Sequence, residues 1–180
     1  MGKFFLGIVA TMVVGAVAGF WYLDTGRLNT RALGQKPSGF EAWLADHALD
    51  ASVARREPAT PDDIASNDRT LATGGALYND HCAVCHGTPG STGPLADALY
   101  PPAPQFAADH PDPRADHDFY VIKYGVRWTG MPGWGHVLRD EQIWTLVTYL
   151  KRFADLPPSV AQANDGGRFP KSRVGRPRYQ

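Results

Sequence analysis

The stretch Cys82-Ala83-Val84-Cys85-His86 decides the fold, and it contains both cysteines of the 180-residue chain. Two residues between the cysteines let one helical turn present both thiols to the two vinyl groups of a single haem. His86 follows directly, so its ring can ligate the iron of that haem. The motif therefore predicts covalent attachment of one haem c.

Two other kinds of site use closely spaced cysteines. A thioredoxin-like dithiol belongs to a strand–helix–strand context, whereas the sequence around Cys82 predicts helices. A zinc site needs four ligands, and the sequence offers no second Cys or His pair at matching spacing. The motif therefore favours haem over a redox dithiol or zinc.

Residues 4–23 form a continuous run of uncharged, predominantly apolar residues. As a helix, this run would span about 30 Å, the thickness of the hydrocarbon core of a bilayer. Trp21-Tyr22 would then lie at the membrane interface. We predict a retained anchor over residues 1–24 that contacts the bilayer through residues 4–23. The alternative is a cleaved signal peptide with Ala16-Val17-Ala18 as its cleavage site.

The charges that flank the anchor and the haem motif are two signals that place the rest of the chain on opposite sides of the membrane. Lys3 precedes the run, whereas Arg27, Arg31 and Lys36 follow it, which weakly favours a cytoplasmic location for the rest of the chain. Covalent haem c, however, is assembled on the outer side of bacterial cytoplasmic membranes, and the haem motif is the more specific signal. We therefore predict a single-pass protein of that membrane with its haem domain in the periplasm.

Residues 25–66 are predicted to connect the anchor to the haem domain. They contain a helix over about 38–56, in which Ser38 and Glu41 have capping-box spacing. His47 lies on or beside an apolar stripe of this helix and is interpreted as a surface or packing histidine. The stripe could pack on the haem domain, on the membrane surface or on a partner subunit. It consists of Phe40, Trp43, Leu44, Ala48 and Ala51.

Residues 67–155 are predicted to be the haem domain, and their pattern is all-α. Helices are expected at about 68–80, 115–124 and 140–153. The stretch from Gly87 to Pro113 is too rich in Gly and Pro for long elements, and we expect it to pack on the porphyrin. Residues 156–180, without an apolar period, are predicted to be a disordered basic tail.

The distribution of charge argues against nucleic-acid binding. The net charge of the whole chain is zero, but residues 61–155 carry seven basic and twelve acidic side chains, a net of −5. Residues 156–180 carry five basic side chains and one acid, a net of +4. The folded part is therefore acidic, contrary to the basic surface that nucleic acid requires.

Met131 is the predicted second axial ligand of the haem iron. It is the one methionine outside residues 1–24, and it lies in the loop sequence Gly130-Met131-Pro132-Gly133. Glycine and proline would shape and stiffen a loop that presents the sulfur. The alternative ligands are the other histidines near the motif or the loop, namely His81, His110, His117 and His136.

Residues 67–155 resemble class I cytochromes c of the small bacterial monohaem type. Cys82–His86 matches the attachment motif of that family, and Met131 in Gly-Met-Pro matches its axial methionine. Gly93-Pro94 resembles the pair whose proline carbonyl accepts a hydrogen bond from the proximal histidine. Four further positions match the close crossing of the N- and C-terminal helices in this family: Gly74, Tyr78, Leu146 and Tyr149.

The resemblance implies a cytochrome c fold around one covalent haem c held by Cys82, Cys85, His86 and Met131, with Pro94 beside it. An iron with both axial positions filled suits one-electron transfer rather than catalysis. The expected partners are redox proteins or a membrane respiratory or photosynthetic complex. The protein would act as a tethered carrier or as the cytochrome subunit of an oxidoreductase, oxidase or reaction centre. The alternative function is a gas sensor or peroxidase-like catalyst in which Met131 is displaced.

Overall fold

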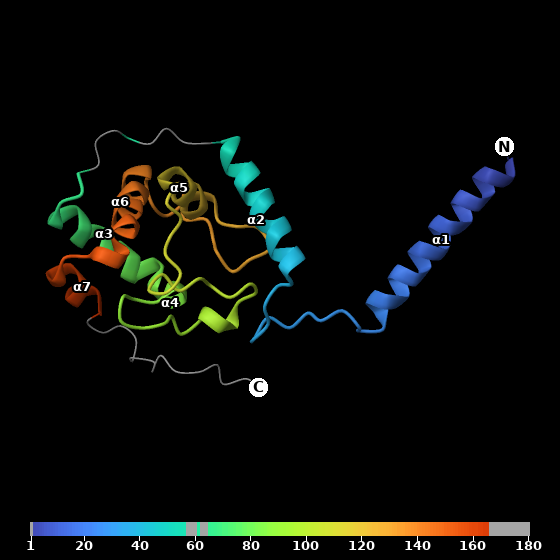
Figure 1. Cartoon of the computed structure of the whole chain (residues 1–180), viewed down its shortest axis with the longest axis horizontal. Helices are drawn as coiled ribbons and strands as arrows, with labels where there is room; N and C mark the ends of the chain where they lie inside the picture. Colours follow the sequence, from blue (N-terminus) through green and yellow to red (C-terminus); the bar gives the residue numbers. More distant parts are fainter. Residues whose placement is uncertain (1, 57–60, 62–64, 166–180) are drawn as a thin grey trace. The chain divides into compact units, whose positions relative to one another are not determined.

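The computed structural model describes residues 2–56, 61 and 65–165, and the regular structure in these ranges is helical (Figure 1). They contain no strand, only an isolated bridge between Thr88 and Ser91. The predicted all-α fold class is therefore confirmed. The helices are α1 (Gly2–Asp24), α2 (Gly39–Ala54), α3 (Asp68–His81), α4 (Ala83–His86), α5 (Ala115–Tyr124), α6 (Asp140–Lys151) and α7 (Pro158–Asp165), with short 3-10 turns η1 (Ala96–Ala98) and η2 (Phe153–Asp155).

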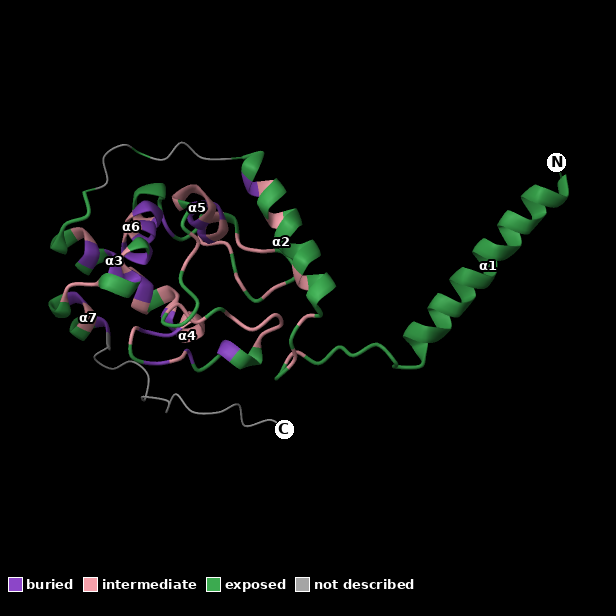
Figure 2. Ribbon diagram, viewed as in Figure 1, coloured by how far each residue is buried: buried purple, intermediate pink, exposed green. Residues whose placement is uncertain are grey.

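The chain forms two compact units, residues 1–31 and 32–180. The first unit contains α1, which has 23 residues, a mean hydropathy of 2.1 and no buried residue (Figure 2). Its length and composition suffice to cross a bilayer. The helix ends where the Thr25 N–H donates to the Trp21 carbonyl and Gly26 takes a φ of 66°, the left-handed conformation common after a helix.

The core of the second unit lies where α3 packs against α6, and α5 packs against α6 as well. Gly74 is the point of closest approach, because a Cβ there would lie 2.7 Å from both the Thr145 carbonyl oxygen and the Tyr149 Cβ. The close crossing implied by the family resemblance is therefore present. Its most deeply buried side chains are Leu71, Tyr78, Ile143, Leu146 and Tyr149.

We expect Gly74→Val to destabilise the second unit strongly. The added atoms meet backbone of α6 that cannot move aside, so the free energy of unfolding should fall by about 3 kcal/mol. Ala72→Val places the same valine side chain at an exposed position of α3 and should change the free energy of unfolding by less than about 1 kcal/mol. Thermal unfolding of the two variants measures the difference, and equal stabilities would contradict the close-contact interpretation.

The C-terminal part of the chain corrects one prediction. Residues 158–165 were predicted to be disordered, but they form α7, which packs on α3. The buried Asn164 links the core helices: its Oδ1 accepts from Asn79 Nδ2 at 2.9 Å, and its Nδ2 donates to Tyr149 Oη at 3.1 Å. The buried Asn164 and Val160, which is 4% exposed and belongs to the hydrophobic core, therefore dock this helix. Two buried residues do not form an apolar period in the sequence. The rest of the predicted tail, residues 166–180, lies outside the described residues.

The second unit also includes α2. The helix starts as predicted, since Ser38 Oγ accepts from the Glu41 N–H at 3.2 Å. The Glu41 carboxylate accepts from Tyr100 Oη at 2.8 Å. Val53 is fully buried, and α2 packs on α5. The helix itself therefore packs on the haem domain.

The face by which α2 packs is not the apolar stripe. Phe40, Trp43 and Leu44 are 71%, 59% and 51% exposed, whereas the side toward α5 carries Ser52 and Val53. Polar contacts hold this side, including the 3.0 Å contact between the hydroxyls of Ser52 and Tyr120. Hydrophobic periodicity therefore indicated the helix but not its docked face.

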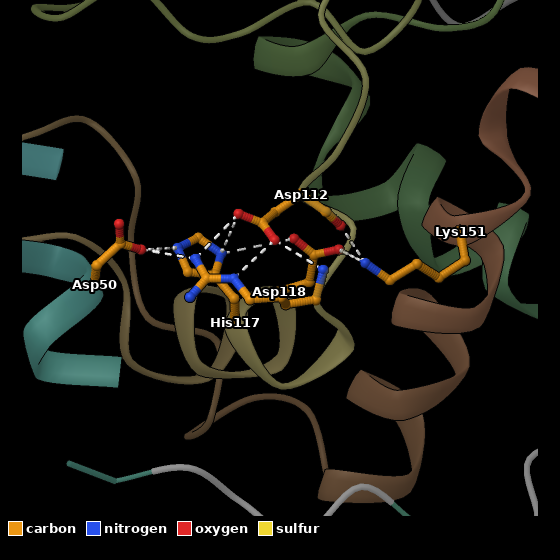
Figure 3. A network of polar contacts seen from close by, with 6 residues as sticks. Asp50, Asp112, His117, Asp118 and Lys151 are labelled. Carbon is orange, nitrogen blue, oxygen red and sulfur yellow. Dashed lines mark hydrogen bonds and ion pairs between the residues drawn. The ribbon is translucent and has the colours of Figure 1, made fainter. Parts of the chain in front are cut away.

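A network of charged side chains connects α2, the loop before α5, α5 and α6 (Figure 3). His117 on α5 is nearly buried, and its ring nitrogens lie 4.0 Å from Asp50 on α2 and 3.8 Å from Asp112. Lys151 on α6 binds Asp118 at 2.8 Å. The ion pair of Arg114 with Asp50, at 2.7 Å, therefore ties the connecting segment to the domain. His117, one of the alternative iron ligands, lies beside this pair, and its Nδ1 makes no hydrogen bond to any described residue.

Candidate haem-binding site

The five-residue motif forms one turn between two helices. Cys82 ends α3 and precedes α4, and its carbonyl accepts from the N–H groups of Cys85 and His86, each at 3.0 Å. Gly87 terminates the turn with a φ of 76°. Both cysteines are unpaired and half-buried. The structure therefore places two thiols and an imidazole on one turn, as the motif predicts.

The environment of the thiols disfavours dithiol redox chemistry. Burial, with the neighbouring Cys85 adding to it, raises the pKa of Cys82 to about 12. Burial also raises the pKa of Cys85. Reactive dithiols need the opposite shift, toward the thiolate. Within the described ranges no three His, Cys, Asp or Glu side chains are grouped so that they could hold a metal ion. The turn therefore fits thioether attachment better than either alternative.

His86 is oriented by the carbonyl of Pro104. Its Nδ1 lies 2.9 Å from that oxygen, and because a carbonyl can only accept, Nδ1 carries the hydrogen and Nε2 keeps its lone pair. The ring also stacks on Phe106, with centroids 4.5 Å apart and planes 4° from parallel. Burial lowers the pKa of His86, against the opposing effect of the bond to Pro104. Burial therefore favours a neutral imidazole, the form that ligates iron, and the bond to Pro104 sets which ring nitrogen carries the hydrogen.

Pro94 does not make the hydrogen bond predicted for it. Pro94 is exposed, and the acceptor for His86 is Pro104, ten residues further along. Gly93 instead packs under the motif, where a Cβ would lie 2.5 Å from the Cys85 carbonyl oxygen. The sequence contains seven prolines between the motif and α5, and only the path of the loop decides which one reaches the histidine.

Gln105 is a structural residue of the site that the sequence did not reveal. Its Nε2 donates to the carbonyls of Cys85 and Ala103, both at 2.8 Å. Its Oε1 accepts from the Gly93 N–H at 2.8 Å. One amide therefore fastens the loop to the haem motif at both ends. A single glutamine in an irregular loop carries no recognisable pattern, and only the neighbouring prolines marked the region.

Met131 lies in a loop whose backbone is fixed. Its N–H donates to Thr129 Oγ1 at 3.0 Å, and its carbonyl accepts from the Val126 N–H at 3.1 Å. Gly125 has a φ of 70° and lies so close to Gly133 that a Cβ would come within 2.6 Å of its nitrogen. The half-buried Met131 side chain packs against the same hydrophobic cluster as Cys82 and Phe106. The structure therefore brings the predicted ligand loop to the core that carries the motif.

The two tryptophans beside Met131 have different environments. Trp134 is half-buried, and its ring lies 4.8 Å from that of His81. Trp128 is 89% exposed and has a φ of 61°. Of the remaining alternative ligands, His110 and His136 are exposed.

Residues 69–150 match the sequence model of the family described as cytochrome c oxidase, cbb3-type, subunit III. The matched range contains the motif turn, the loop with Gln105 and the Met131 loop. Residues 69–150 form a c-type cytochrome domain. The cytochrome domain is therefore an electron-transfer module that binds haem c with its iron. Two unpaired thiols on one turn and an imidazole with an unprotonated Nε2 are the groups that this cofactor requires.

Among solved structures, the chain is similar to one in the reducing HAO-like protein complex of Kuenenia stuttgartiensis. The two are 22% identical, with a TM-score of 0.42, and the similarity covers 55% of this chain and 47% of the other. This chain therefore spans about half the length of that relative. No curated protein matches the chain.

Proposed function

We propose that the protein is a membrane-anchored periplasmic cytochrome that carries single electrons between redox partners. It would act as a tethered carrier or as the cytochrome subunit of a membrane oxidoreductase, oxidase or reaction-centre complex. The observation that carries the proposal is the arrangement around the motif turn. The Pro104 carbonyl orients His86 of this turn, and Cys82 and Met131 pack against the same hydrophobic core. The apolar, unburied α1 supports an anchor.

Four residues would hold a single haem c in this proposal. Cys82 and Cys85 would form its two thioether bonds, and His86 Nε2 and the Met131 sulfur would be the axial ligands. When bound, haem c supplies one-electron oxidation and reduction. Because protein atoms would fill both axial positions, these residues exclude substrate from the iron. The arrangement therefore favours electron transfer over gas sensing or peroxidase activity.

Trp128 is the residue that we assign to partner docking. Its ring is almost fully exposed three residues before Met131, and its positive φ is rare for a bulky side chain. The Arg127 guanidinium lies 5.8 Å from the ring centroid. Exposed tryptophan and arginine are typical of the residues that dominate interface energetics. A backbone conformation with an energetic cost indicates selection for the position of this ring.

We expect Trp128→Gly to slow electron transfer to the partner without changing the reduction potential. Glycine adopts the positive φ freely, so the loop and Met131 should stay in place while the docking ring is lost. The second-order rate constant should fall roughly tenfold, the effect of an interface residue worth about 1.4 kcal/mol. Stopped-flow reduction by native membranes measures it, with Trp128→Phe as the aromatic control. Equal rates for the wild type and Trp128→Gly would remove Trp128 from the docking surface.

A further inference from the structure

The structure carries an aromatic surface that the electron-transfer site does not use. We propose that the α2 aromatic face, defined as Phe40, Trp43, Leu44 and His47, inserts into the interfacial layer of the bilayer and so orients the cytochrome domain on the membrane. The proposal rests on the proposed function only in taking α1 as a membrane anchor.

The α2 aromatic face is a continuous stack of side chains on the exposed side of the helix. The rings of Phe40 and Trp43 are 6.0 Å apart with planes 30° from parallel, and Trp43 stacks on His47 at 5.7 Å and 9°. Leu44 lies beside them, because positions i+3, i+4 and i+7 share one side of a helix with position i. More than half of the surface of Phe40, Trp43 and Leu44 is exposed. Three large apolar side chains are therefore left in contact with solvent together.

The cytochrome domain itself does not cover this face. The opposite side of α2 already packs on the domain, with Val53 fully buried. The carboxylates of Glu41 and Asp50 are engaged with Tyr100 at 2.8 Å and Arg114 at 2.7 Å. The helix is therefore docked on the domain with its aromatic side outward, and that side is open to another surface.

The covalent link to α1 keeps that surface close to the bilayer. The connecting segment is hydrogen-bonded to the domain at Gly34, whose N–H donates to the Asp97 carbonyl at 3.2 Å. Residues 25–33 lie between the end of α1 and this contact, and nine extended residues reach at most about 30 Å. Phe40 follows only six residues later. The α2 aromatic face is therefore held within a short distance of a membrane that is always present.

The chemistry of the face fits the membrane interface. Tryptophan is enriched where the hydrocarbon meets the headgroups, and amphipathic helices lie there with their apolar side about 5–10 Å deep. The tether raises the effective concentration of lipid at the face without any further contact. A protein partner would have to displace the lipid that the tether keeps near this face. The bilayer is therefore the occupant that the structure favours.

Spin labelling of the full-length, haem-loaded protein tests the proposal. A nitroxide is attached to Leu44→Cys, which is labelled selectively because the motif cysteines are held by haem. The protein is reconstituted in vesicles of phosphatidylethanolamine and phosphatidylglycerol, and the collision rates of the label with oxygen and with a water-soluble nickel chelate are compared. Val13→Cys in α1 is the membrane control. Val137→Cys, 53% exposed against 51% for Leu44, is the matched control on the domain.

We expect the oxygen-to-nickel collision ratio at position 44 to rise above one on reconstitution, as at position 13, while at position 137 it stays below one. A low ratio at position 44 with a high ratio at position 13 would overturn the inference and leave the anchor intact. Low ratios at both would overturn the anchor as well. A label at position 44 that neither reagent reaches would show that protein covers the face, which also overturns the proposal. Labelling at His47→Cys repeats the test if Leu44→Cys does not fold.

Discussion

Replacing Cys82 and Cys85 together by alanine is expected to abolish covalent haem attachment completely. The two thiols lie unpaired on one turn, and the chain contains no other cysteine that could form a thioether. Mass spectrometry of the denatured wild type should show the mass of the polypeptide plus one haem, and the double variant should show the polypeptide alone. The expected change is all or none, because a thioether cannot form without its sulfur.

Ala83→Ser within the same turn is the matched control and should keep the haem, since it leaves both thiols in place. Haem retained after denaturation in the double variant would contradict the assignment. A wild type without added mass, produced in cells that mature c-type cytochromes, would contradict the prediction of a covalent cofactor altogether.

Met131→Ala is expected to change the iron site more than any other single substitution outside the motif. The oxidised wild type should show the weak near-infrared band of methionine–iron ligation, and the variant should lose it. The reduction potential should fall, because a thioether ligand favours the reduced iron. The reduced variant should bind one carbon monoxide per protein, whereas the wild type should bind none.

Met12→Ala in α1 provides a methionine control that leaves the spectrum unchanged. A wild-type spectrum of bis-histidine type would refute Met131 as the ligand, and His136→Ala would then be the variant to test. An unchanged spectrum in Met131→Ala would also refute Met131 as the ligand.

The sequence predicted the parts of the site that are local in the chain. Cys82, Cys85 and His86 are contiguous, so one turn of helix positions them whatever surrounds it. The α3–α6 crossing was implied by the family resemblance at Gly74, Tyr78, Leu146 and Tyr149. The structure shows why position 74 is a glycine, since a Cβ there would meet Thr145 and Tyr149. The bounds expected for the short helix at 115–124 agree with α5 at Ala115–Tyr124.

The parts that depend on long-range contacts could not be predicted in this way. The acceptor for His86 is Pro104 rather than Pro94, because the course of an irregular loop, fastened by Gln105, decides which proline arrives. The buried Asn164 and Val160 dock α7, and two residues do not make a periodic pattern in the sequence. The helix α2 packs on α5 through Ser52 and Val53 rather than through its apolar stripe, so the stripe faces outward.

A potentiometric titration of the full-length protein, with and without carbon monoxide, tests the central claim most directly. An electron carrier with His86 and Met131 on the iron should show a single reversible one-electron transition, at the same potential under carbon monoxide as under argon. A transition that shifts upward under carbon monoxide would show that the reduced iron has an open or displaceable position. That result would contradict the electron-carrier account and favour a gas sensor or catalyst.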